Sequence, residues 1–191
     1  MRPVTIGDCT LPVSTCVPGR DASQSHFNYI DISAVDRNLK AITNARCLAS
    51  ADAPSRVRLA LASGDILVST VRPNLNTVAV VPPRYDGSVG STGFCVLRCD
   101  ERKLHNRYLF HWTQTPKFFA NLTRQATGAG YPAVSDATIK AEQVPPPPIS
   151  EQRRIAEILD DADAPIELSE SYRESGNPGP EYLQRELRRP V

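Results

Sequence analysis

The sequence lacks a cysteine pattern typical of a disulfide framework or a zinc-binding module. Its five cysteines form no C-x-x-C pair, and an odd number of thiols cannot all pair within one chain. We therefore expect reduced thiols. The alternative is a zinc site built from Cys95, Cys99 and His105, but its spacing is loose, and Cys95, Leu97 and Cys99 alternate like residues on one face of a strand.

Long apolar runs are also missing. No stretch approaches the roughly 20 apolar residues that span a bilayer, and Met1-Arg2-Pro3 is not followed by the apolar segment of a secretory signal. Hydrophobic residues nevertheless make up 40% of the chain, which is enough for a core. We expect a globular cytoplasmic protein without a membrane partner.

Catalytic motifs are absent or incomplete. The segment Val81-Pro82-Pro83-Arg84-Tyr85 is similar to a motif of DNA amino-methyltransferases, but Val81 replaces the Asp or Asn that would bind the target amine. No acidic pair is followed by E-x-K, and the three histidines have no evident nucleophile partner. The glycines at 87–93 precede a predicted strand, so they do not fit a dinucleotide fingerprint. We expect no catalytic residue, metal or cofactor in this chain.

The formal net charge of +1 conceals an asymmetry along the chain. Residues 1–140 hold 16 basic and 10 acidic side chains, whereas residues 141–191 hold 6 basic and 11 acidic ones. Arginine supplies 18 of the 22 basic residues, and its planar fork suits phosphate and guanine edges. A codon bias toward arginine explains this excess equally well. Phosphate binding is therefore expected in the first part of the chain, if anywhere.

Hydrophobic periodicity predicts a mixed domain. Strand-like alternation or short apolar runs occur at 27–32, 57–61, 66–70, 78–81 and 93–98. Helical spacing follows at 106–112 and 115–125, and residues 34–44 suit a turn or a short helix. This order predicts an α+β fold, in which a twisted, mostly antiparallel, strand-rich domain precedes a helix.

A proline run ends this domain. The prolines at 145–148 cannot enter a helix interior or a central strand and predict an extended strut. Ser150 is a suitable N-cap for an amphipathic helix over 149–164. Its apolar stripe is Ile155, Ile158, Leu159 and Ala162, which must pack against another surface.

Beyond this helix the pattern deteriorates. Pro165 and the Gly/Pro-rich segment at 176–180 break helical structure. We therefore divide the chain into a domain over 1–148, a helix over 149–164, and an irregular or disordered tail over 165–191. A frameshifted or truncated reading frame would produce such a tail.

Two polar segments are candidate DNA contacts. Arg72, Asn74 and Asn76 follow a predicted strand, and their side chains can contact guanine and adenine edges bidentately, although asparagine near proline is also ordinary turn chemistry. Residues 127–132 form a glycine-flanked loop in which Tyr131 is suited to stack on DNA or to donate a hydrogen bond to it. The alternative is that Tyr131-Pro132 forms a cis-proline turn packed under the domain.

Four blocks of the sequence resemble, in order, the specificity subunits of type I DNA restriction-modification systems. The resemblance covers roughly residues 27–164. The blocks are Tyr29-Ile30-Asp31-Ile32-Ser33, then GDILVSTVRP from Gly64, then GAGYPAVS from Gly128, and PPISEQRRIAEILD from Pro147. Four ordered matches are far more specific than one motif. The last block is similar to the boundary between a target recognition domain and the conserved spacer helix.

The resemblance implies a non-enzymatic subunit that binds half of a bipartite double-stranded DNA site. It implies as partners the methyltransferase subunits, which carry S-adenosylmethionine, the ATP-dependent restriction-translocase subunit, and a possible second copy or half-subunit. Candidate DNA contacts are Arg72, Asn74, Asn76, Arg84, Arg124, Tyr131 and Lys140. Candidate partner contacts are Glu151, Gln152, Arg154, Ile155, Ile158 and Leu159. The alternative is a truncated interaction remnant that docks methyltransferase subunits without recognising DNA.

Overall fold

Strands dominate the first hundred residues of the chain, and helices follow them. The computed structural model describes residues 3–18 and 25–163. The strands are β1 (Val4–Thr5), β2 (Thr10–Leu11), β3 (His26–Ile30), β4 (Val35–Asp36), β5 (Ala41–Ile42), β6 (Arg46–Ala49), β7 (Val57–Ala60), β8 (Ile66–Ser69), β9 (Val78–Val80), β10 (Val89–Ser91), β11 (Phe94–Cys99) and β12 (Gln143–Val144). The α-helices are α1 (Asn106–Thr113), α2 (Pro116–Gln125), α3 (Asp136–Ala141) and α4 (Ile149–Asp163). Five single-turn 3-10 helices connect them: η1 (Gly7–Cys9), η2 (Ile32–Ala34), η3 (Ser50–Asp52), η4 (Pro73–Leu75) and η5 (Pro83–Tyr85).

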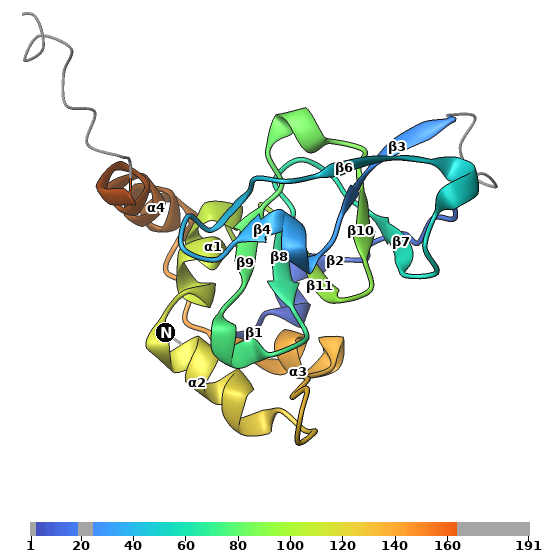
Figure 1. The fold of residues 1–191 in the computed structure, drawn as a ribbon. Helices are drawn as coiled ribbons and strands as arrows, with labels where there is room; N and C mark the ends of the chain where they lie inside the picture. Colours follow the sequence, from blue (N-terminus) through green and yellow to red (C-terminus); the bar gives the residue numbers. More distant parts are fainter. Residues whose placement is uncertain (1–2, 19–24, 164–191) are drawn as a thin grey trace, which may run out of the picture. The chain divides into compact units, whose positions relative to one another are not determined.

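These strands form two four-stranded sheets and two short ribbons (Figure 1). One sheet has the order β6-β3-β10-β7 and the other the order β2-β11-β8-β9. In the part of the chain described here, the pairing of β10 with β3 is parallel and all the other strand pairings are antiparallel. The predicted α+β, mostly antiparallel fold is therefore confirmed.

Strands β8 and β11 lie at the centre because both faces of this pair are covered. On one face Ile66, Val68 and the alternate residues of β11 belong to a core cluster with α1, α2 and α3. On the other face Leu67 and Phe94 pack with residues of β3, β4 and β5. Each fully buried side chain of this size contributes about 1.5–3 kcal/mol to folding. Burial on both faces explains why β8 reads as a continuous apolar run.

The cysteines of β11 follow the expected alternation. Cys95, Leu97 and Cys99 all face the helical cluster. Burial raises the pKa of the Cys95 thiol to about 12 and that of Cys99 further. The described residues contain no group of three or more His, Cys, Asp or Glu side chains that could hold a metal ion. Both thiols therefore act as apolar core atoms.

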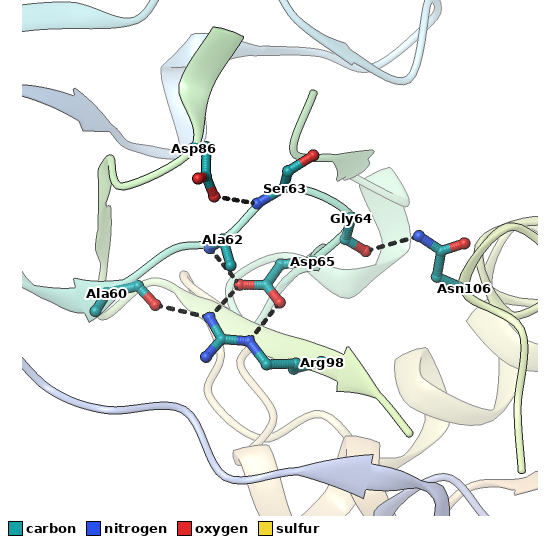
Figure 2. Close-up of polar contacts among 8 residues, drawn as sticks. All are labelled: Ala60, Ala62, Ser63, Gly64, Asp65, Asp86, Arg98 and Asn106. Carbon is teal, nitrogen blue, oxygen red and sulfur yellow. Dashed lines mark hydrogen bonds and ion pairs between the residues drawn. The ribbon is translucent and has the colours of Figure 1, made fainter. Parts of the chain in front are cut away.

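An ion pair between buried Asp65 and partly buried Arg98 holds the turn between β7 and β8 (Figure 2). The Asp65 carboxylate accepts two hydrogen bonds from the Arg98 guanidinium, at 2.8 and 2.7 Å, and one from the backbone N–H of Ala62 at 2.8 Å. Arg98 also donates to the carbonyl of Ala60 at 3.1 Å, and Asn106 of α1 donates to Gly64. A tight turn joins β7 to β8, in which the N–H of Asp65 donates to the carbonyl of Ala62, and the two strands belong to different sheets. The Asp65–Arg98 pair thus fixes the point where the chain changes sheets.

The sequence did not identify several short elements. Residues 34–44, predicted as a turn or a short helix, contain the β4–β5 hairpin. Its turn forms because the Asp36 carboxylate accepts hydrogen bonds from the backbone N–H groups of Asn38 and Leu39. The strands β2, β6, β10 and β12 and the helix α3 were also not predicted. The predicted helices at 106–112 and 115–125 correspond to α1 and α2, the second of which begins with Thr115 accepting a hydrogen bond from the N–H of Phe118.

The segment around the proline run closes the domain. Val144 of β12 pairs with Val4 of β1, so the two ends of the domain lie side by side. Helix α4 then begins at Ile149, and Ser150 lies inside it, so the predicted N-cap was wrong. Residues 1–159 form one compact unit, and residues 160–191 form a second. Of the second unit the structure describes residues 160–163, the last turn of α4, and the predicted tail over 165–191 lies outside the described residues.

Candidate nucleic-acid interface

The loop at residues 72–76, which we call the η4 loop, has an unusual backbone. Arg72 (φ 49°, ψ 58°) and Asn76 (φ 44°, ψ 52°) both adopt the left-handed conformation, one on each side of the 3-10 turn. This conformation costs a non-glycine residue on the order of 1–3 kcal/mol. Pro73 is buried, whereas Arg72 and Asn74 are exposed. The buried proline therefore anchors the loop while its polar side chains face outward.

A second loop, at residues 127–133, meets the η4 loop. The Arg72 N–H donates to the carbonyl of Pro132 at 2.7 Å, and the Arg72 guanidinium lies 4.4 Å from the centre of the Tyr131 ring. Thr127 and Ala133 exchange backbone hydrogen bonds that close this loop. Tyr131 is 71% exposed, and the described residues contain no cis peptide bond. The alternative of a cis-proline turn packed under the domain was wrong.

The β4–β5 hairpin touches the η4 loop from the other direction. Lys40, also left-handed at φ 51°, donates from Nζ to the carbonyl of Asn76 at 2.5 Å. On the next strand the carbonyl of Ile42 accepts a hydrogen bond from Arg84, whose guanidinium lies 5.0 Å from the Tyr85 ring. The hairpin thus links the η4 loop to Arg84. No sequence pattern had singled out Lys40.

The remaining candidate DNA contacts lie on helices. Arg124 is exposed in the last turn of α2, which packs beside η4, and it donates to Asn121 at 3.2 Å. Lys140 lies in the last turn of α3, with its backbone close to Gly7 of η1. The structure thus brings Arg72 and Tyr131 into direct contact, with Asn76 at the other end of the η4 loop and Arg124 on a neighbouring helix. It gives Lys140 no contact with this group.

The candidate partner contacts on α4 divide into buried and exposed residues. Gln152 is 1% exposed and is fully used inside the domain. Its side-chain oxygen accepts from the N–H of His105 at 2.8 Å, and its amide donates to the carbonyls of Pro147 at 2.8 Å and Lys103 at 3.3 Å. In this conformation it offers no hydrogen-bonding group to a partner. This is a correction to the expected interface.

The other α4 candidates follow the same division. Ile155 is partly buried against the helical core cluster, which contains Phe118 and Leu122. Ile158 is 54% exposed and Leu159 38% exposed. Glu151 and Arg154 form an exposed ion pair with contacts of 2.7 and 2.9 Å. The exposed part of the expected interface is therefore Ile158 and Leu159 with this charged pair beside it.

Comparisons with known proteins agree with this architecture. The family described as "Type I restriction modification DNA specificity domain" matches residues 58–175. The HsdS subunit from Thermoanaerobacter tengcongensis has a similar crystal structure, with 34% sequence identity and a TM-score of 0.77 over 97% of this chain and 45% of that one. A structure described as the basis of complex assembly and conformational transition of the type I R-M system gives 35% identity and a TM-score of 0.78, with the same coverage.

The match covers only part of each of these relatives. This chain spans less than half the length of these two solved structures. Among curated proteins no sequence matches. None of the described helices is long and apolar enough to cross a membrane. The extent of the family match and the identity across nearly the whole chain show that this protein belongs to the type I restriction-modification DNA specificity subunits, a non-catalytic family.

Proposed function

We propose that this domain binds one half of a bipartite double-stranded DNA site in a sequence-specific manner. One observation carries the proposal: the η4 loop holds Arg72 and Asn74 exposed beside exposed Tyr131, on a backbone with two left-handed non-glycine residues. Such strain persists only where the surrounding structure imposes it, and it is concentrated at functional sites. The excess of basic residues in 1–140 supports the same conclusion.

Each side chain of this surface has a chemically suitable role. Arg72 can donate bidentately to a guanine, and Asn74 can pair with an adenine edge. The Tyr131 ring beneath the guanidinium restricts its motion, so less entropy is lost when a base is bound. Arg84 and Arg124 are exposed arginines on flanking elements, where phosphate contacts would orient the domain on the duplex.

We further propose that α4 helps to direct methyltransferase and restriction-translocase subunits to the bound site. Ile158 and Leu159 are exposed on a helix that is joined to the recognition domain through Gln152. An apolar pair on a rigidly attached helix is suited to a partner helix or to a second copy of this subunit. One of the similar structures is described in terms of complex assembly, which agrees with a docking role.

The proposal can be tested by selecting duplexes from a randomised pool with the full chain, alone and together with its methyltransferase subunits. We expect selective, salt-dependent binding, because both base and phosphate contacts are involved. Arg72→Ala and Asn74→Ala should each lower affinity for the selected duplex by about 5- to 150-fold, the equivalent of a good bidentate contact.

The matched control is Arg56→Ala. Arg56 is an exposed arginine that precedes β7 in the other sheet, so its loss removes the same charge away from the η4 loop. If Arg72→Ala and Arg56→Ala bind equally well, the η4 loop is not the recognition surface. If methyltransferase subunits co-purify with the parent protein but no duplex is selected, the protein is the interaction remnant instead.

A further inference from the structure

The left-handed residues of this protein converge. In the ranges 3–18 and 25–163, the non-glycine residues with positive φ are Lys40, Arg72 and Asn76. Lys40 is 36 residues from Asn76 in sequence, yet its Nζ lies 2.5 Å from the Asn76 carbonyl oxygen. Strained residues from two distant segments therefore meet at one point, and this point is the end of the η4 loop.

The segment that brings Lys40 there is the turn of the β4–β5 hairpin, residues 37–40, which we call the β4–β5 turn. The Asp36 side chain fixes the shape of this turn, because it accepts hydrogen bonds from the N–H groups of Asn38 and Leu39 at 2.8 and 3.0 Å. These bonds lower the pKa of the Asp36 carboxyl group. Arg37 and Asn38 are exposed, and Leu39 is 69% exposed. A rigid turn thus presents a cation, an amide and an apolar side chain to solvent.

An open, mostly polar hollow lies at the base of this turn. It is lined by Ser33, Val35, Asp36, Arg37, Asn38 and Thr43. Arg37 makes no hydrogen bond or ion pair with the described residues that would occupy its guanidinium. Burial, and then the nearby charge of Arg37, lower the pKa of the Lys40 ammonium group. An anion bound at the turn would relieve this crowding of like charges.

Lys40 itself is placed for a structural task. Its side chain is partly buried, and its ammonium group satisfies a carbonyl at the end of the 3-10 turn, where no further helical N–H is available. The bond fixes the distance between the β4–β5 turn and the η4 loop. Because both segments have rigid backbones, their exposed side chains occupy a fixed spacing.

We infer that the β4–β5 turn is a second DNA-contacting segment, in which Arg37 binds a backbone phosphate next to the bases contacted by the η4 loop, and that Lys40 is the positioning residue that sets the spacing of the two segments. This inference rests on the proposed function of the η4 loop. It adds a segment that no sequence motif indicated and assigns Lys40 a role that does not require contact with DNA.

The first test is Arg37→Ala in the full chain, measured on the duplex selected by the parent protein. Loss of one phosphate contact should reduce the slope of log affinity against log salt by about 1 and weaken binding to all duplexes alike. The melting temperature should not change, because Arg37 is exposed. Arg56→Ala serves as the control and should leave the slope unchanged.

The second test is Lys40→Met, which keeps the aliphatic stem and removes the ammonium group. We expect the base preference at the positions contacted by the η4 loop to broaden, whereas Arg37→Ala leaves these preferences intact. Lys40→Arg retains a donor and should restore part of the selectivity. A merely structural role of Lys40 would lower the melting temperature without altering base preference in the folded fraction.

The outcomes separate the two proposals. If Arg72→Ala abolishes selective binding while Arg37→Ala keeps the parent salt slope, or Lys40→Met keeps the parent base preference, the function stands and this inference is wrong. If the parent protein selects no duplex under any condition, both are overturned. If Lys40→Met does not fold, the salt slope of Arg37→Ala decides the matter, since retention of the parent slope contradicts the inference.

Discussion

Replacement of Gln152 by alanine should detach α4 from the recognition domain. The side chain makes two short hydrogen bonds, to the His105 N–H and the Pro147 carbonyl at 2.8 Å each, and a longer one of 3.3 Å to the Lys103 carbonyl. Leaving a buried polar group unsatisfied costs about 1–3 kcal/mol. If only the two short hydrogen bonds are counted, we expect the free energy of unfolding to fall by about 2–6 kcal/mol. This is a large share of the about 5–15 kcal/mol typical of a domain.

Equilibrium unfolding in urea measures this loss, and hydrogen exchange locates it. Arg153→Ala, at the next and exposed position, is the matched control, because both variants place an alanine in the same helix and so share its helix propensity. It should change stability by no more than about 0.5 kcal/mol. In Gln152→Ala, amides of residues 149–159 should exchange faster, while those of β8 and β11 remain protected.

A loss below about 1 kcal/mol for Gln152→Ala would refute this reasoning. It would mean that water replaces the glutamine without cost, and that the helix is held by apolar contacts such as those of Ile155 and Ala156. Equal acceleration of exchange in α4 and in the central strands would instead show that the helix and the domain unfold as one unit.

Three further predictions concern other parts of the chain. Changing both Ile158 and Leu159 to Asp should abolish co-purification with methyltransferase subunits or self-association, while circular dichroism and the melting temperature stay close to the parent values, because both side chains are exposed. Asp100→Asn should destabilise the domain at neutral pH but not near pH 2. The hydrogen bonds from Arg102 lower the pKa of the Asp100 carboxyl to about 2, so the stability that the carboxylate contributes is present above pH 4 and is lost as the pH falls toward 2. Acid titration of both proteins, followed by their unfolding, would measure this difference. Iodoacetamide followed by mass spectrometry should modify exposed Cys47 in the native protein and leave buried Cys95 unmodified until urea unfolds the chain; rapid native modification of Cys95 would contradict its place in the core.

Long periodic segments were predictable from the sequence, and short ones were not. The spacing of Phe118 and Leu122 identified α2, and the apolar run from Ile66 identified β8, because burial imposes these patterns over several residues. The β4–β5 hairpin has strands of two residues, too short for any period. It forms because the Asp36 side chain accepts hydrogen bonds from the backbone of its own turn. Asparagine and aspartate make such bonds in many loops that are not hairpins, so the residue type alone does not predict one.

The sequence singled out only those candidate site residues that lie in or next to a recognisable motif. The sequence could single out Arg72 and Tyr131 as candidates because they lie within recognisable motifs, and Asn74 because it follows one. Lys40 was not singled out, since its role depends on a contact across 36 residues. Gln152 was misjudged because a polar residue in a predicted surface helix is normally exposed, and only the tertiary structure supplies the three backbone groups that bury it.

The pairing of β1 with β12 has a consequence for how such domains combine. Val4 and Thr5 lie opposite Val144 and Gln143, so the polypeptide enters and leaves the domain at adjacent points. A unit whose ends meet can be inserted into a longer polypeptide, duplicated there, or exchanged for another of the same design without stretching the segments on either side. The prolines that follow β12 add a stiff connection at the exit. Under the proposed function, exchange of such a cassette in a single recombination event would change the nucleotide preference of an assembly and leave the segments on either side in place.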